Sequence, residues 1–182
     1  TNNSIKSCNF TSTGIKDKLK NMIGNAVWNT GANDGVTYIY NNIITSKFYE
    51  LERSTNTGKI CSSSSSWCND TVARITTWTG KIGLMYPSDY GYATSGGGGK
   101  IDRASCLNAS LYDWKYNPCR NNDWLISDWQ WTLSPFAGSP YANEVFDVDG
   151  SGRVDNCDAS NSPGVRPVGY LLPSVKISSG TG

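Results

Sequence analysis

Short segments of alternating polar and apolar residues, separated by turns, fill the last fifty or so residues and limit the fold more than any other sequence feature. Residues 144–148 and 153–157 flank the turn Asp149-Gly150-Ser151-Gly152, and such a glycine-containing turn between two short segments predicts a β-hairpin. Side chains of a strand alternate between its two faces, so these segments are typical of sheets with one buried face. Further strands are predicted at residues 71–78, 128–134, 164–172 and 175–178.

Helical periodicity is concentrated in the first part of the chain. Apolar residues recur at helical spacing between residues 15 and 27, with Thr11–Thr13 as candidate N-caps and Gly31 as a stop signal. A second helix is predicted at residues 46–53, capped by Ser46, and a helical turn at residues 102–112. The early apolar stripe consists of Ile15, Leu19, Met22, Ile23, Ala26 and Val27. Two early helices followed by many short strands indicate a loop-rich α+β fold with a twisted antiparallel sheet.

Length and charge exclude several classes of protein. A chain of 182 residues is typical of one domain, which we expect to span residues 1–182. The net charge of +1 argues against a nucleic-acid partner, because nucleic-acid-binding domains are usually strongly basic. The sequence lacks an apolar run of the length that a transmembrane helix needs, so we expect no membrane span in this chain. It starts without a signal-peptide pattern, so any export signal is expected to be already absent.

Histidine is absent from the sequence, which excludes Ser-His-Asp and Cys-His catalysis and histidine-containing zinc sites. We therefore expect no enzyme and no cofactor. Tyr, Ser and Asn carry the polar character instead, as in binding surfaces that combine rigid aromatic contacts with adaptable hydrogen bonds. Arg166 is expected to anchor the closing strand through an acidic or carbonyl partner. Acidic residues that could form a catalytic carboxylate pair are present, but we expect them to be solvated surface acids: Asp89, Asp102, Asp123, Asp128 and Glu144.

The six cysteines suggest disulfides and an extracellular or cell-surface location. Six cysteines allow 15 pairings, and the sequence alone does not choose among them. Short loop closure favours Cys61–Cys68 and Cys106–Cys119, and elimination then leaves Cys8–Cys157.

One segment resembles a 12-residue calcium loop. Glycine occupies the position where such a loop turns sharply, and oxygen-bearing side chains occupy the ligand positions. The same residues also suit a hairpin tip, and the following Pro163 does not allow a helix to continue. The hairpin is the preferred interpretation, and a calcium site is the minor alternative. Its ligands would be Asp147, Asp149, Ser151, Asp155 and Asp158.

Polar and aromatic residues between positions 129 and 161 form a candidate ligand-binding surface. They are interspersed with Val145, Val148 and Val154, so we expect the valines on the inner face of a sheet and the polar set on the outer face. An ordinary solvated sheet face, with Trp129 or Trp131 in the core, is the alternative for any single residue. The candidate ligand-binding residues are Trp129, Trp131, Tyr141, Asn143, Asp147, Asp149, Arg153, Asp155, Asn156, Asp158 and Asn161.

Several long segments resemble one family of bacterial surface proteins, often of prepilin type or of unknown function. The segments are FTSTGIKDKLKNMIGNAVWNTG, WTGKIGLMYPSDYGYAT, NDWL, WTLSPFAG and VFDVDGSGRVDNCDASNSPGVRPVGYLLPSVKI, within residues 9–178. A Trp-containing strand, a variable stretch and then GVRPV are similar to the C-type lectin fold of formylglycine-generating-enzyme-like domains and of variable proteins from diversity-generating retroelements. Formylglycine-generating enzymes need a reactive cysteine pair, and this sequence has no counterpart of that pair.

The resemblance implies a non-catalytic domain that presents a polar and aromatic surface to a protein or glycan ligand on another cell or surface. Such a surface could be diversified by a retroelement. Family members carry an upstream pilin-like helix, so this chain is expected to start after an anchor. The alternative function is a pilin-type structural filament subunit. The ligand and the oligomeric state are left open.

Overall fold

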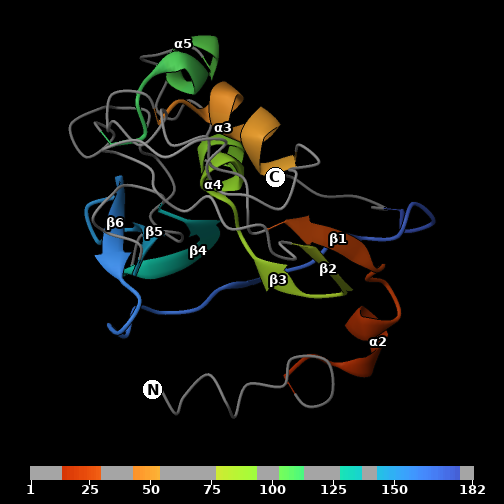
Figure 1. Ribbon diagram of the computed structural model, residues 1–182. Coiled ribbons are helices and arrows are strands. Elements are labelled where there is room, and N and C mark those ends of the chain that lie inside the picture. Colours follow the sequence, from red (N-terminus) through yellow and green to blue (C-terminus); the bar gives the residue numbers. More distant parts are fainter. Residues whose placement is uncertain are drawn as a thin grey trace.

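The computed structural model (Figure 1) describes residues 14–29, 43–53, 77–93, 103–112, 128–136 and 143–176. Helices and antiparallel strand pairs are mixed along these residues, which confirms the expected α+β class. The elements are α2 (Asp17–Lys20), β1 (Ala26–Asn29), α3 (Thr45–Arg53), β2 (Thr77–Gly80), β3 (Gly83–Leu84), α4 (Pro87–Ala93), α5 (Arg103–Asn108), β4 (Gln130–Pro135), β5 (Glu144–Val148), β6 (Val154–Asp158) and β7 (Pro167–Val168).

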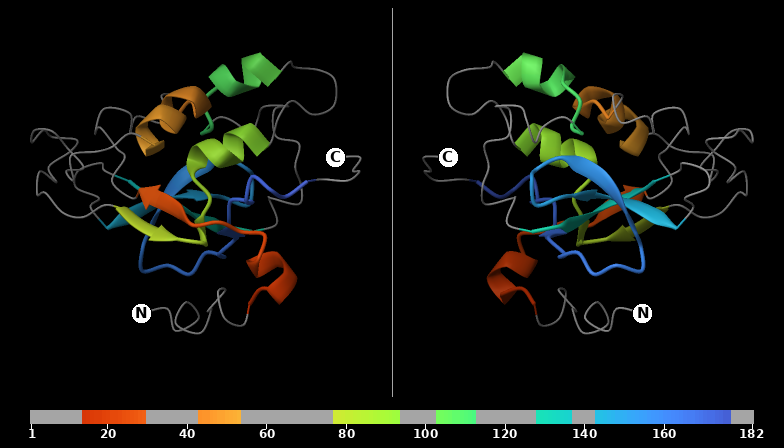
Figure 2. Two further views of the ribbon diagram at one scale, coloured as in Figure 1. Left: turned by 90° about the vertical axis from the view of Figure 1, so that its right-hand side faces the viewer. Right: turned by 90° about the vertical axis from the view of Figure 1, so that its left-hand side faces the viewer.

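The described strands form small antiparallel sheets. β1 pairs with β2, β3 pairs with β7, and β5 lies between β4 and β6 in a three-stranded sheet. Figure 2 shows α3, α4 and α5 on one side of the strands and α2 on the opposite side. No described helix has the length and apolar character that crossing a bilayer requires.

The β5–β6 hairpin confirms the strongest sequence prediction. Its strands pair from Glu144 opposite Asp158 to Val148 opposite Val154. At the tip, Asp149 Oδ1 accepts hydrogen bonds from the backbone N–H of Ser151 at 2.7 Å and from the Ser151 hydroxyl at 2.6 Å. This is an Asx turn, in which the side chain replaces a backbone acceptor and holds the reversal of the chain.

The inner face of the three-stranded sheet packs against the helical layer. Phe146, Val148 and Val154 have no exposed surface. The Phe146 ring makes edge-to-face contacts with Phe48 of α3 at 5.4 Å and with Phe136 at 5.2 Å between ring centroids. These contacts fix α3 over β5, and they place the end of α3 beside α4.

The helix predicted for residues 15–27 is wrong in most of its length. α2 covers only Asp17–Lys20, and Ala26–Asn29 form strand β1. Val27, assigned to the buried stripe, is 69% exposed, whereas the neighbouring Trp28 is fully buried. Burial of this large ring against β2 and its neighbours outweighs a weak local helical preference, and Gly24 lowers that preference further.

Other predicted segments have mixed outcomes. The helix at residues 46–53 is confirmed as α3, and α5 and β4 lie within or across their predicted ranges. The strand predicted at 164–172 shrinks to β7 and to isolated bridges at Gly164 and Leu171, while residues 175–176 are not in a strand. Of the strand predicted at 71–78, residues 71–76 lie outside the described part of the chain.

Helix α4 was not predicted, although Pro87 begins it and Ser88 and Asp89 follow. Pro at the first helical position is a recognised start signal, because its missing N–H would have no partner there. α4 crosses α3 closely at Gly91, where an added Cβ would lie 2.2 Å from Thr45 Oγ1. Only glycine allows this approach of the two helices.

We therefore expect Gly91→Ala to lower the free energy of unfolding by about 1–3 kcal/mol, the usual cost of overfilling a packed contact. Urea unfolding at neutral pH measures the change. Gly150→Ala is the matched control, because the nearest atom to an added Cβ there lies 3.9 Å away. Equal midpoints for both variants would contradict the tight α3–α4 crossing.

Candidate functional site

The predicted surface around the hairpin is only partly exposed. Trp129 is 43% exposed, whereas Trp131 and Asp147 are buried at 7% and 0%. The candidate residues that lie at the exposed surface are Asn143 and Asn161, and the half-buried ones are Arg153, Asp155, Asn156 and Asp158. Asp149 is buried and holds the hairpin turn, and Tyr141 lies outside the described residues. Trp131, Asp147 and Asp149 are therefore not exposed on a binding surface as predicted, and Trp131 follows the alternative of a core position.

The remaining residues of this predicted set do not share one face. Asp155 pairs with Asp147, whereas its neighbour Asn156 pairs with the core residue Phe146. Consecutive residues of a strand point to opposite faces, so Asp155 and Asn156 lie on opposite sides of the sheet. The valines divide in the same way, since Val145 is on the face of Asp147 and Val148 is in the core.

Most carboxylates of the predicted calcium loop are bonded to other groups of the protein. Arg153 Nε donates to Asp149 Oδ2 at 2.7 Å and its guanidinium also pairs with Asp155, while the backbone N–H of Ser160 donates to Asp158. Within the described part of the chain, no group of three acidic or cysteine side chains is arranged to hold a metal ion. The hairpin interpretation of this segment is confirmed.

Asp147 is the exception in this hairpin, because neither carboxylate oxygen has a hydrogen-bond partner. Burial, together with the nearby carboxylates of Asp155 and Asp149, raises the pKa of Asp147 to about 7. The folded protein therefore favours the neutral form of this side chain, since an isolated buried charge is very unfavourable.

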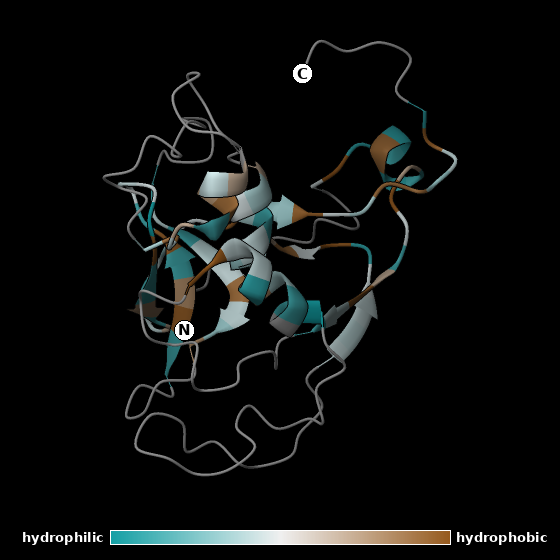
Figure 3. Cartoon of the chain, turned by 90° about the horizontal axis from the view of Figure 1, so that it is seen from above, coloured by the Kyte–Doolittle hydropathy of each residue, from teal (hydrophilic) through white to brown (hydrophobic). Residues whose placement is uncertain are grey.

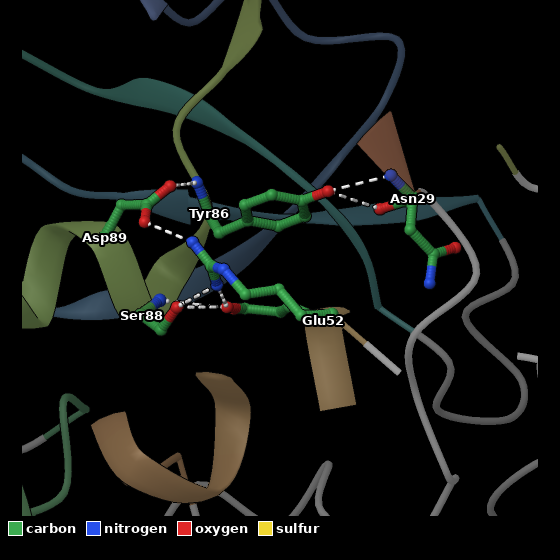
Figure 4. Close-up of polar contacts among 6 residues, drawn as sticks. Asn29, Glu52, Tyr86, Ser88 and Asp89 are labelled. Atoms are coloured by element: carbon green, nitrogen blue, oxygen red, sulfur yellow. Dashed lines mark hydrogen bonds and ion pairs between the residues drawn. The ribbon is translucent and has the colours of Figure 1, made fainter. Parts of the chain in front are cut away.

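A second polar cluster joins the end of α3 to the start of α4, and Figure 4 shows it. We call it the Arg53 cluster: Glu52, Arg53, Tyr86, Ser88 and Asp89. Arg53 donates from Nη2 to Asp89 Oδ1 at 2.6 Å and from Nη1 to Ser88 Oγ at 3.0 Å and Glu52 Oε2 at 3.2 Å. Ser88 donates its hydroxyl to Glu52 Oε2 and its backbone N–H to Glu52 Oε1.

Tyrosine rings hold the Arg53 guanidinium in place. Its central carbon lies 4.1 Å from the ring centroid of Tyr49 and 4.9 Å from that of Tyr86. The Tyr86 hydroxyl is itself fixed, because it accepts from Asn29 N–H at 2.8 Å and donates to Asn29 C=O at 3.1 Å. The arginine is therefore anchored through Tyr86 to strand β1.

Burial changes the charge state of this cluster. Glu52 is fully buried, and burial raises its pKa to about 8 despite hydrogen bonds from Ser88 and the nearby Arg53. Burial by itself lowers the pKa of Arg53, but the carboxyls of Asp89 and Glu52 hold it above its usual value. At neutral pH the cluster thus contains a neutral Glu52 and an Arg53–Asp89 ion pair.

A cleft opens beside Asp89, between α4 and the segment around β7. We call it the α4–β7 cleft, and its volume is about 520 Å³. Asp89 connects it to the Arg53 cluster, because the same carboxylate lines the cleft and accepts from Arg53. The other lining residues include Met85, Tyr90, Arg166, Val168 and Gly169. Charged groups of both signs thus lie among apolar side chains.

The residues of this site differ from those predicted from the sequence. Asp89 was expected to be a solvated surface acid, but it is half-buried and bonded to Arg53 and to the backbone N–H of Tyr86. Arg166 was expected only to anchor a strand, and it lines the cleft. The one local signal was the helix start at Pro87, which would have placed Ser88 and Asp89 in a first turn.

The cysteine predictions are tested in part. Cys106 is buried and disulfide-bonded, and its partner lies outside the described residues. Cys157 is a free thiol that accepts from Asn161 Nδ2 at 3.0 Å, so the predicted Cys8–Cys157 pair is wrong. Elimination gave that pair only by assuming that all six cysteines are bonded. Cys8, Cys61, Cys68 and Cys119 lie outside the described residues.

Comparison with known proteins gives no relative. No family model, curated protein or solved structure matches the chain.

Proposed function

We propose that this chain is a non-catalytic ligand-binding domain of an extracellular or cell-surface protein, and that its protein or glycan ligand occupies the α4–β7 cleft. The observation that carries the proposal is the cleft of about 520 Å³ beside the Arg53 cluster. Small-ligand sites are usually clefts of about 300–1,000 Å³ with apolar walls and a few placed polar groups. Asp89 and Arg166 are such groups here.

Rigid support of these polar groups favours binding. Asp89 is bonded to Arg53 and Tyr86, and Tyr86 is bonded to β1, so the carboxylate does not have to be ordered when a ligand arrives. Preorganised groups lose less conformational entropy on binding. Tyr and Arg are also the side chains that most often dominate binding energy in protein interfaces.

Burial argues against catalysis by the Ser88–Glu52 pair. Neither side chain has exposed surface, so a ligand in the cleft does not reach the hydroxyl or the carboxyl. Glu52 is also mainly protonated at neutral pH because burial raises its pKa to about 8, and a protonated carboxyl is no base.

The proposal also includes a C-type-lectin-like fold and the diversification of its surface by a retroelement. A C-type-lectin-like arrangement is consistent with the small antiparallel sheets beside α3, α4 and α5. A reverse transcriptase gene beside a near-copy of the segment encoding residues 129–161 would indicate deliberate diversification. An experimental structure with a different strand connectivity would remove the lectin comparison and leave the cleft.

The alternative function, a pilin-type filament subunit, has one supporting observation. Leu19 of α2 is 42% exposed and Leu171 is 51% exposed, and Leu171 pairs with Ile23, shortly after α2. Figure 3 shows hydrophobic colours on several of the outer segments of the chain. Exposed apolar side chains on adjacent segments suit subunit contacts. Ordered polymers in electron micrographs would favour this function over ligand binding.

Filling the cleft tests the proposed function. Ala93 lines the cleft and ends α4, so Ala93→Trp is expected to block entry without disturbing the core. We expect at least a tenfold loss of binding to whichever ligand the wild type retains on glycan and peptide arrays. Val27→Trp is the matched control, because Val27 is 69% exposed and does not line the cleft. Unchanged binding by Ala93→Trp would contradict the site, and no binding to either array would contradict the function.

A further inference from the structure

The Arg53 guanidinium has donors that the protein does not use. A guanidinium has five N–H groups, and the hydrogen bonds to Glu52, Ser88 and Asp89 use at most three of them. The Nε–H and one N–H of Nη2 have no partner among the described residues. The side chain is 26% exposed, so part of it is accessible to solvent.

The position of this edge is fixed before any ligand arrives. Tyr49 and Tyr86 hold the guanidinium at 4.1 Å and 4.9 Å, and Asp89 holds Nη2 at 2.6 Å. Tyr49 is 43% exposed, and so is Tyr170, which packs at 5.3 Å from the Trp28 ring beside Tyr86. A donor edge beside exposed aromatic rings is a preformed receptor for a planar acceptor.

The local charge balance selects the acceptor. Asp89 offsets the positive charge of Arg53, and Glu52 is mainly neutral at neutral pH because burial raises its pKa. A monoanion therefore brings a single further negative charge to a guanidinium that Asp89 already offsets. A dianion such as phosphate is disfavoured by the Asp89 carboxylate, which is bonded to the same Nη2 atom.

We propose that the ligand of this domain carries a carboxylate, and that the free edge of the Arg53 guanidinium receives it. This inference rests on the proposed function. A carboxylate is planar and matches two parallel N–H groups of arginine, which lysine does not offer. The carboxylate can belong to an acidic sugar or to a peptide, and the ligand's remaining part extends into the α4–β7 cleft.

The first test uses matched small probes. Sodium glucuronate and N-acetylglycine represent the two carboxylate sources, and the glucuronate methyl ester and N-acetylglycinamide are their neutral counterparts. We expect either acid to give a saturable shift of the Arg53 Nε–H signal in ¹⁵N-resolved NMR and at least tenfold tighter binding than its neutral counterpart. The acid that binds more tightly identifies whether the carboxylate comes from a sugar or from a peptide. Equal binding of acid and neutral probe, or of inorganic phosphate and the acids, overturns the inference.

Two variants separate recognition from loss of structure. Arg53→Lys keeps the charge but removes the paired donors, and we expect it to lose at least tenfold in affinity for the acid while its circular dichroism is unchanged. Should this variant fail to fold, Glu52→Gln gives an independent readout. In the wild type, ionisation of Glu52 above pH 8 places a second negative charge beside Arg53, so affinity for the acid falls between pH 7 and pH 9.

Glu52→Gln should remove that loss of affinity, because the amide stays neutral. The other titratable or charged groups facing Arg53 are kept in this variant: Tyr49, Tyr86, Asp89 and Tyr170. The same fall of affinity in both proteins would overturn the role of the Arg53 edge. If the array ligand that Ala93→Trp no longer binds has no carboxylate, this inference is overturned and the proposed function still stands.

Discussion

Asp147→Asn is expected to raise the free energy of unfolding at pH 8 by about 2 kcal/mol. Asp147 has no exposed surface and neither of its oxygens is hydrogen-bonded. A rise of its pKa from 3.8 to about 7 corresponds to about 4 kcal/mol that the ionised carboxylate costs the folded state. A buried amide without partners still costs about 1–3 kcal/mol, so the net gain is smaller than the full penalty.

The sign of this effect depends on pH. The folded-state pKa of Asp147 lies above its unfolded value, so the folded protein holds its proton more strongly. The stability that the protonated Asp147 contributes is fully present below about pH 4, and this contribution is lost as pH rises through about 7. Urea unfolding at pH 4, 6 and 8 should therefore show a gain for Asp147→Asn that grows with pH and is absent at pH 4. Asp17→Asn is the control at an exposed aspartate. A gain independent of pH would contradict the burial of an unpartnered carboxylate.

The β5–β6 hairpin could be predicted because its signals are local. The Asp149 side chain accepts hydrogen bonds from the backbone N–H groups of Ser151 and Arg153, all within four residues. The flanking strands pair with each other. The order of buried and exposed residues along β5 could not be predicted in the same way. Asp147 reads as an outward polar residue, but β4 and β6 enclose it from both sides, and no local pattern contains that information.

The Arg53 cluster could not be predicted because it joins distant parts of the chain. Arg53 and Asp89 are 36 residues apart, and Tyr86 bonds to Asn29 across 57 residues. Each residue alone is unremarkable in sequence, since a charged residue near a helix end is usually solvated. Only the close crossing of α3 and α4 turns these side chains into one network.

The two polar clusters therefore have different roles. In the hairpin, Asp149 and Arg153 bond to each other and hold the turn, so this region is a scaffold. In the Arg53 cluster, the network leaves donors of Arg53 unused and opens on a cleft. Within the described residues, the unused donors of Arg53 thus lie near the cleft, whereas Asp149 and Arg153 of the hairpin are bonded to each other.

Trp28→Ala is expected to lower the free energy of unfolding by about 4 kcal/mol and to abolish binding in the α4–β7 cleft. Trp28 is fully buried, and its Nε1–H donates to the carbonyl of Gly80 at 3.0 Å. Its ring centroid lies 6.4 Å from that of Tyr86 in a stacked arrangement and 5.3 Å from that of Tyr170 in a tilted one. Truncating a buried Trp usually costs about 3–5 kcal/mol, because the cavity left behind only partly closes.

A second substitution tests whether this loss comes from the packing seen here. An added Cβ at Gly83 would lie 2.6 Å from the Trp28 ring, so Gly83→Ala alone should destabilise the protein by about 1–3 kcal/mol. In the Trp28→Ala background the new methyl group has room, so Gly83→Ala should cost far less there. Denaturant unfolding of the wild type, both single variants and the double variant measures this coupling. Val27→Ala, on the exposed side of the same strand, should change stability by less than about 0.5 kcal/mol. Additive effects of Trp28→Ala and Gly83→Ala would show that the ring does not lie against β3, and the aromatic support of the Arg53 cluster would then be wrong.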